Sequence, residues 1–70
     1  MRPLSGKDVC EILIKHGFVQ VRQKGSHIIM QKNEEGKTTS IPVPNHKELR
    51  SGTLRSIIRQ SGLVKSEFEK

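Results

Sequence analysis

Residues 18–43 read FVQVRQKGSHIIMQKNEEGKTTSIPV, and this stretch decides the fold. Apolar and polar side chains alternate in three short segments, with the period of two that is typical of β-strands. The segments are 18–22, 26–32 and 38–43. Turns containing Gly25 and Gly36 separate them, and Pro42 places the third segment at a sheet edge or at a strand end. The stretch therefore predicts a three-stranded antiparallel meander.

A helix is predicted on each side of this meander. Before it, Ser5 and Asp8 form a capping-box pattern, and apolar residues then recur at helical spacing until Gly17. After it, Ser51 is the expected N-cap of a second helix, which ends at Gly62. The predicted order is therefore helix, three strands, helix.

This order predicts an α+β fold in which both helices pack on one face of the antiparallel sheet and the other face stays open. The buried sheet face is expected to consist of Val19, Val21, Ile28, Met30, Ile41 and Val43. The helices are expected to close the core with Val9, Ile12, Leu13, Leu54, Ile57 and Ile58. Phe68 is the candidate anchor of the tail, residues 64–70. Seventy residues make one domain of nearly minimal size.

Charge gives the first indication of a partner. Thirteen Lys and Arg against seven Asp and Glu give a net charge of +6 and a pI near 10. A basic field of this kind favours nucleic acid or an acidic protein. Phe18 and Phe68 are the only aromatic residues, so base stacking is an improbable way to hold a single strand. Phosphate and sugar contacts are expected to carry the binding instead.

Cysteine use and hydropathy indicate the compartment. Cys10 is the single cysteine, which excludes an intramolecular disulfide and a Cys-rich metal site. No apolar run reaches membrane-spanning length, and the first residues lack the apolar segment of a signal peptide. We therefore expect a soluble, cytoplasmic protein with no membrane association.

The first turn of the meander carries the candidate chemistry. Lys24, Gly25, Ser26 and His27 place a cation, a hydroxyl and a group that titrates near neutrality within a few residues. Such a patch can bind a phosphate ester and move a proton on it. The alternative interpretation is a simple turn followed by an ordinary surface histidine. His16, by contrast, lies at a helix end and is given no chemical role.

Three motifs resemble the HicA toxins, the mRNA-cleaving halves of HicA–HicB toxin–antitoxin pairs. They are Gly25-Ser26-His27, Pro44-Asn45-His46 and the segment 52–63, GTLRSIIRQSGL. The resemblance spans about residues 5–68, so residues 1–70 are expected to form a single HicA-like toxin domain. It implies a double-stranded-RNA-binding-domain-like fold and metal-independent endoribonuclease activity. It also implies that His27 is the catalytic residue, and that a HicB antitoxin covers the active face.

One histidine is chemically sufficient for a slow nuclease. RNA carries its own nucleophile, the 2′-hydroxyl, and a positioned base that removes its proton can start cleavage without a metal. An imidazole, with a reference pKa of about 6.5, can act as base or acid at neutral pH. Lys24 or an arginine can stabilise charge on the phosphoryl oxygens. Acid–base help of this kind contributes typically about 10²–10⁴-fold.

The remaining candidate residues have two interpretations each. His46 is either a second proton carrier or, as we favour, a structural residue before the second helix. Arg55 and Arg59 either clamp phosphates or form a solvated helix face. Ile29 shares the open sheet face with His27. We expect it to dock the antitoxin, with Lys24 pairing to antitoxin acids.

No cofactor is expected, and three histidines on separate elements do not make a metal-ligand set. The expected partners are mRNA and a HicB-like antitoxin. Two alternatives to the nuclease stay open. One is a non-catalytic double-stranded-RNA-binding module of the same fold, although the segment from Gly52 lacks the lysine cluster of such modules. The other is a module whose basic face serves only an acidic protein.

Overall fold

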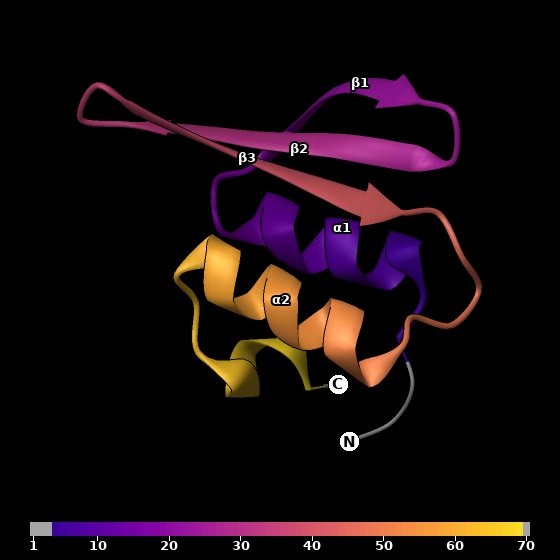
Figure 1. Cartoon of the computed structure of the whole chain (residues 1–70). Helices are drawn as coiled ribbons and strands as arrows, with labels where there is room; N and C mark the ends of the chain where they lie inside the picture. The colour runs from indigo at the N-terminus through magenta and orange to yellow at the C-terminus, as the bar shows by residue number, and fades with distance from the viewer. Residues whose placement is uncertain (1–3, 70) are drawn as a thin grey trace.

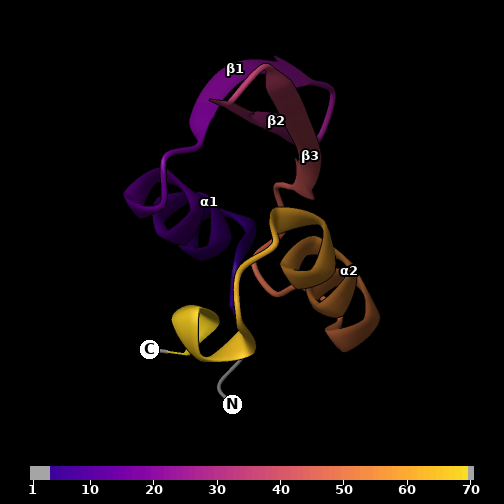
Figure 2. The same cartoon turned by 90° about the vertical axis from the view of Figure 1, so that its left-hand side faces the viewer.

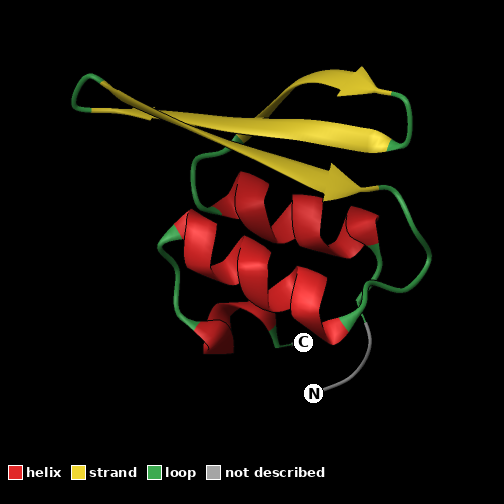
Figure 3. Cartoon of the chain, in the orientation of Figure 1, coloured by secondary structure: helices red, strands yellow, loops and turns green. Residues whose placement is uncertain are grey.

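The computed structural model describes residues 4–69, and it has the predicted order of elements (Figure 1). The elements are α1 (Gly6–Lys15), β1 (Val19–Lys24), β2 (His27–Glu34), β3 (Lys37–Pro44), α2 (Ser51–Ser61) and the 3-10 helix η1 (Lys65–Phe68). Figure 3 shows both α-helices on the same side of the sheet, which confirms the α+β layout. Figure 2, turned by 90°, shows the opposite face of the sheet without a covering element. Among the described residues, no helix is long and apolar enough to cross a bilayer.

The sheet is an antiparallel meander with the order β1-β2-β3. Gly25 opens the first turn with a φ of 60°, the left-handed value that a two-residue hairpin with glycine first requires. Glu35 and Gly36 form the second turn with φ values of 50° and 81°. Both turns have two residues, and they fix the register of the strands on either side.

The predicted start of α1 and the predicted ends of both helices are confirmed. Ser5 Oγ accepts the Asp8 amide and Asp8 Oδ2 accepts the Ser5 amide, both at 3.0 Å, so the predicted capping box starts α1. Gly17, with a φ of 97°, follows the end of α1, and Gly62, with a φ of 74°, caps α2. Left-handed backbone of this kind strains other residues, which is why glycine ends both helices.

The N-cap of α2 differs from the prediction. The helix begins at Ser51 itself, and Arg50 occupies the N-cap position with no side-chain hydrogen bond to the helix. Serine is a good cap in general, but here the extended backbone that a cap requires falls one residue earlier, at Arg50. The first turn of α2 also carries no acidic side chain, so its amide end is electropositive.

The core lies between the sheet and the two helices. Its sheet side has four of the six predicted residues: Ile28, Met30, Ile41 and Val43. The predicted helix residues are buried with them, except Ile58, which is partly buried. The core also contains Leu4, Cys10, Phe18 and Leu49. Burial raises the pKa of the Cys10 thiol, which keeps it protonated.

The prediction for Val19 and Val21 is wrong. Their side chains are 58% and 45% exposed. The pairing of β1 with β2 shifts between Gln20 and Arg22, where a β-bulge adds one residue to β1. A slip of one residue moves side chains to the other face, so Val19 pairs with the outward Gln31 rather than joining the core.

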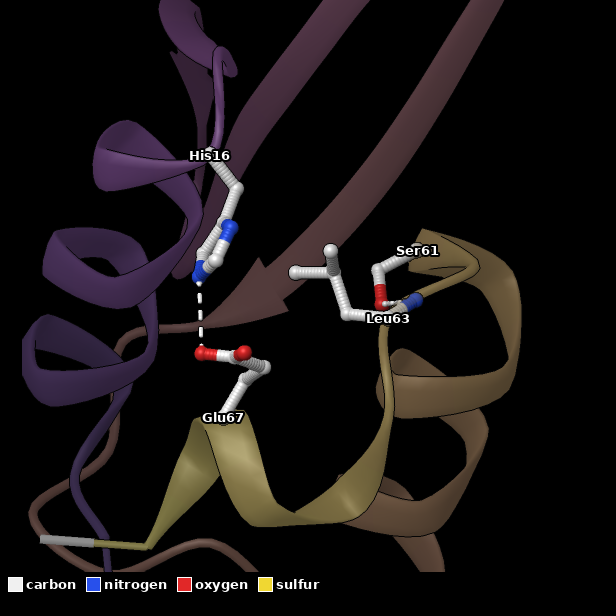
Figure 4. Close-up of polar contacts among 4 residues, drawn as sticks. All are labelled: His16, Ser61, Leu63 and Glu67. Atoms are coloured by element: carbon white, nitrogen blue, oxygen red, sulfur yellow. Dashed lines mark hydrogen bonds and ion pairs between the residues drawn. The ribbon is translucent and has the colours of Figure 1, made fainter.

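The C-terminal segment folds back over the helices. Ser61 Oγ accepts the Leu63 amide at 3.1 Å and turns the chain after α2 (Figure 4). Glu67 of η1 then reaches His16 at the end of α1, with 3.3 Å between Oε2 and Nε2. Phe68 is fully buried, as predicted, so η1 closes the end of the core away from the sheet.

Candidate functional site

His27 is the first residue of β2, and its side chain is exposed. Lys24 of β1 is its cross-strand partner on one side, and Pro44 of β3 is its partner on the other. Directly opposed residues of antiparallel strands have Cβ atoms about 4.5–5.5 Å apart. The two-residue turn therefore brings the predicted cation and the predicted imidazole together on the open face of the sheet.

Two hydrogen bonds hold the turn that precedes His27. The Asn45 amide donates to the Ser26 carbonyl at 2.7 Å, and the Gln23 side-chain amide donates to the Gly25 carbonyl at 3.3 Å. The first of these bonds ties the turn to the segment that follows β3. His27 is thus positioned by two separate stretches of chain.

A groove leads from His27 across the end of β3 to α2. It has a volume of about 470 Å³. Its lining residues are His27, Pro42, Pro44, Gly52, Thr53, Ser56, Ile57 and Gln60. On the α2 side the lining is largely polar, and Gln60 donates to the Ser56 hydroxyl at 3.1 Å. A chain with hydroxyls and phosphates can therefore find hydrogen-bond partners along the groove.

Arg55 and Arg59 border this groove. They line an adjacent hollow of α2 together with Gly52, which lines both hollows. The spacing of 52, 55 and 59 puts all three residues on one side of the helix. Within residues 4–69 neither arginine makes an ion pair, so both guanidinium groups are available to an anion. The structure thus places the two predicted arginines next to the His27 groove.

A family model described as HicA toxin of bacterial toxin-antitoxin matches residues 6–63 of the 70-residue chain. The chain belongs to the HicA toxin family. The match runs from the start of α1 to the residue after the α2 cap, so it includes the turn, the groove and both arginines. Membership makes the protein the toxin of a bacterial toxin–antitoxin system, with an antitoxin as its partner. No curated protein matches the chain.

His46 of this HicA toxin lies outside the His27 groove. It lines a hollow near the start of α1 with Ser5, Lys7, Asn45 and Lys47. Its carbonyl accepts the Gly6 amide at 2.9 Å and so helps to start α1. This bond does not involve the imidazole, and the structure groups the two histidines in different hollows, so the structural interpretation of His46 stays a prediction.

Ile29 of the HicA chain lies on the open face, two residues along β2 from His27. It pairs with Arg22 on β1 and Pro42 on β3, and these neighbours leave it half-buried. The open face thus offers an apolar centre with cations on one side of it.

The sequence did not single out several residues of this HicA site. Arg22 joins Lys24 on the open face because both residues follow the bulge. Thr53, Ser56 and Gln60 line the groove at the spacing of one helix face. The sequence of the motif 52–63 shows this spacing. Polar residues at the same spacing also form a solvent-exposed helix face, so the spacing alone does not predict a groove.

The charge of the HicA site comes from cations alone. Lys24, Arg55 and Arg59 border the site and His27 lines it, and among residues 4–69 no acidic side chain lines either groove. In the part of the chain that the structure describes, no three His, Cys, Asp or Glu side chains gather so that they could hold a metal ion. The arrangement therefore suits a polyanionic ligand and one proton-transferring group.

Proposed function

We propose that this toxin is an endoribonuclease that cleaves mRNA without a metal ion, and that a HicB-like antitoxin neutralises it. One observation carries the proposal. An exposed histidine stands directly opposite a lysine, at the end of a groove that has polar side chains of α2 on one side and that two arginines border. The family supplies the toxin role, and this geometry supports RNA as the target.

His27 acts on the ribose next to the scissile phosphate. Its imidazole takes the proton of the 2′-hydroxyl, the 2′-oxygen forms a bond to phosphorus, and the bond from phosphorus to the 5′-oxygen breaks. The leaving 5′-oxygen takes a proton from the imidazolium or from water. The first products are a 2′,3′-cyclic phosphate and a 5′-hydroxyl, and no metal-bound nucleophile is required.

Lys24 stabilises the transition state, in which negative charge grows on the phosphoryl oxygens. Its place opposite His27 suits this role, because a cation there meets the oxygens of the same phosphate. Arg55 and Arg59 hold phosphates further along the strand, and Gly25 and Ser26 leave room for the backbone of the RNA at the turn. These contacts do not read the base sequence, so they position the RNA but do not select its sequence.

Chelation tests the proposal most directly. We expect purified toxin to cleave mRNA at the same rate in EDTA as without it, because the proton transfer needs His27 and RNA only. The measurement is the cleavage rate of a defined transcript in EDTA, with and without added Mg²⁺ or Mn²⁺. Activity that disappears in EDTA and returns only with one of these ions contradicts the single-histidine mechanism. Binding without cleavage under all conditions supports the non-catalytic RNA-binding alternative.

RNA affinity is expected to fall with salt. Each phosphate contact contributes a slope of about −0.7 to the plot of log K against log salt concentration for a single strand. Arg55→Gln and Arg59→Gln should therefore each make the slope shallower by about 0.7 and weaken binding. Lys37→Gln is the matched control, because Lys37 lies beside the β2–β3 turn, which extends beyond the helices in Figure 1. Equal slopes for all three variants would show that the arginines do not hold phosphate.

The antitoxin is expected to cover the open face at His27 and Ile29. Ile29→Asp should weaken its binding by more than about 1 kcal/mol, since an aspartate there puts a charge into a buried contact. Titration calorimetry of the purified pair measures this loss. Val64→Asp is the control, because Val64 is exposed in the segment after α2. Unchanged affinity in a folded Ile29→Asp protein contradicts the predicted interface.

A further inference from the structure

The outer edge of β1 is open. β1 pairs with β2 on one side, and no strand within residues 4–69 lies along its other side. All six of its residues are exposed. Figure 2 shows β1 at the margin of the sheet, on the side of α1. Such an edge presents backbone N–H and C=O groups that another strand can pair with.

The opposite edge of the sheet is protected. β3 carries Pro42 and Pro44, which lack the N–H that strand pairing requires, and α2 packs against β3. β1 has the sequence VQVRQK, with no proline. The two edges of one sheet thus differ, and only the β1 edge has the chemistry of a pairing edge.

Exposed apolar side chains gather around β1. Of the four large apolar residues that are exposed among those described, three are Ile14, Val19 and Val21. A groove of about 620 Å³ runs between α1 and β1. Ile14, Cys10 and Ile28 supply its apolar lining, and Gln20 and Gln23 of β1 line it too. A strand beside β1 would place every second side chain over this groove.

The other side chains of such a strand would lie on the open face, where β1 is basic. Arg22 and Lys24 both lie on this face, and β1 has no acidic residue. Neither cation makes an ion pair with any residue that the structure describes. Acids on the added strand would meet these cations. The groove, by contrast, has charges of both signs in its lining, Lys7 as well as Asp8 and Glu11, and its remaining lining includes Cys10, Ile14 and Ile28, so apolar side chains suit it better than acids. The complementary strand is therefore acidic on one face and apolar on the other.

We propose that the β1 edge docks an extended acidic segment of a partner protein, which adds to the sheet as a fourth strand. Its acidic side chains face Arg22 and Lys24, and its apolar side chains enter the groove between α1 and β1. Backbone pairing supplies the affinity, and the alternation of side chains supplies the specificity. The proposal does not require His27 to be catalytic, because the docking groups are the backbone edge of β1 and its cations; Lys24 is the one residue that this edge shares with the proposed nuclease site.

A second copy of this chain fits the edge less well. Antiparallel self-pairing of β1 would bring Arg22 and Lys24 of both copies together, between molecules that each carry a charge of +6. The bulge at Val21 also breaks the register of the edge. Any added strand, from a second copy or from a partner, can therefore follow β1 in regular register only for a short distance, so charge complementarity is what favours the acidic partner over a second copy.

Two peptides of opposite charge test the proposal on the full chain. The probes are acetyl-(Val-Glu)₄-amide and acetyl-(Val-Lys)₄-amide, titrated into ¹⁵N-labelled protein at low salt. We expect the glutamate peptide to bind at least tenfold more tightly, to shift the amide signals of β1 and of the groove face of α1, and to slow hydrogen exchange in β1. Arg22→Glu should remove this preference, because it reverses one of the two cations. Lys37→Glu, the same charge change beside the β2–β3 turn, should keep it.

Three results would overturn the proposal. The first is equal binding of both peptides, or no binding at millimolar concentration. The second is a set of shifts confined to α2 and the His27 groove, which would assign the acidic peptide to the RNA site. The third is a dimer of the free protein, measured by light scattering, in which the β1 amides are already protected. RNA cleavage by the same protein sample is measured in parallel. A failure of the docking proposal can therefore be distinguished from a failure of the nuclease proposal.

Discussion

His27→Ala is expected to lower the rate of RNA cleavage by about 10²–10⁴-fold, the usual contribution of a general acid–base group. The folded state should be almost unaffected. The His27 side chain is exposed, and among residues 4–69 it makes no hydrogen bond or ion pair. Its removal therefore leaves no cavity and no unpaired buried group. Toxicity on expression should disappear with the cleavage.

His46→Ala is the matched control. It removes an exposed imidazole of the same size from a neighbouring loop, and its carbonyl bond to the Gly6 amide does not depend on the side chain. We expect this variant to keep most of the activity. Thermal unfolding of both variants checks the fold. A folded His27→Ala protein that cleaves at the wild-type rate disproves the assignment, and a loss in His46→Ala equal to that in His27→Ala indicates a histidine pair instead.

Most of the fold was predictable because local signals agree with each other. The capping box at Ser5, the glycines after both helices and the alternation of β2 and β3 each specify one conformation. Long strands with a buried face have a strongly determined register. β1 was different, since its valines alternate like core residues although the bulge and the sheet edge leave them in solvent. A bulge adds one residue to a strand but does not change the alternation of apolar and polar residues in the sequence. The alternation therefore predicted the wrong sheet face for Val19 and Val21.

The candidate site was predictable in part, for a similar reason. His27 and Lys24 lie on either side of a two-residue turn, so local sequence fixes their relation. The groove lies between β3 and α2, and its position depends on how the helix packs on the sheet. The role of Thr53 and Ser56 as lining residues follows from that packing. No pattern within the helix contains this information.

The site also depends on a close contact at the start of α1, against Pro44, which lines the groove. Gly6, at the start of α1, is buried against the segment that follows β3. A Cβ atom at Gly6 would lie 2.1 Å from the Pro44 carbonyl oxygen and 3.1 Å from the Asn45 Cα. Pro44 pairs with His27, and the Asn45 amide holds the Ser26 carbonyl. Glycine at position 6 therefore lets α1 support the backbone that positions His27.

Gly6→Ala is accordingly expected to destabilise the protein by at least about 2 kcal/mol, because the obstacle is backbone and cannot rotate away. For a domain of this size the midpoint of thermal unfolding should fall by roughly 8–16 °C. Cleavage should also fall at temperatures where the variant is still folded, since Pro44 and Asn45 must move. The measurements are thermal unfolding by circular dichroism and the cleavage rate at low temperature.

Gly52→Ala is the control for helix propensity. It makes the same change in the first turn of α2, where a Cβ atom meets nothing within 4 Å. Alanine lowers the conformational entropy of the unfolded chain relative to glycine. This variant should therefore be about 0.4–1 kcal/mol more stable than the wild type. Opposite signs for the two substitutions would show that the contact with Pro44, and not helix formation, determines the loss at Gly6. Equal stability of Gly6→Ala and the wild type would mean that α1 and the segment after β3 can separate without cost, and that the support of His27 lies elsewhere.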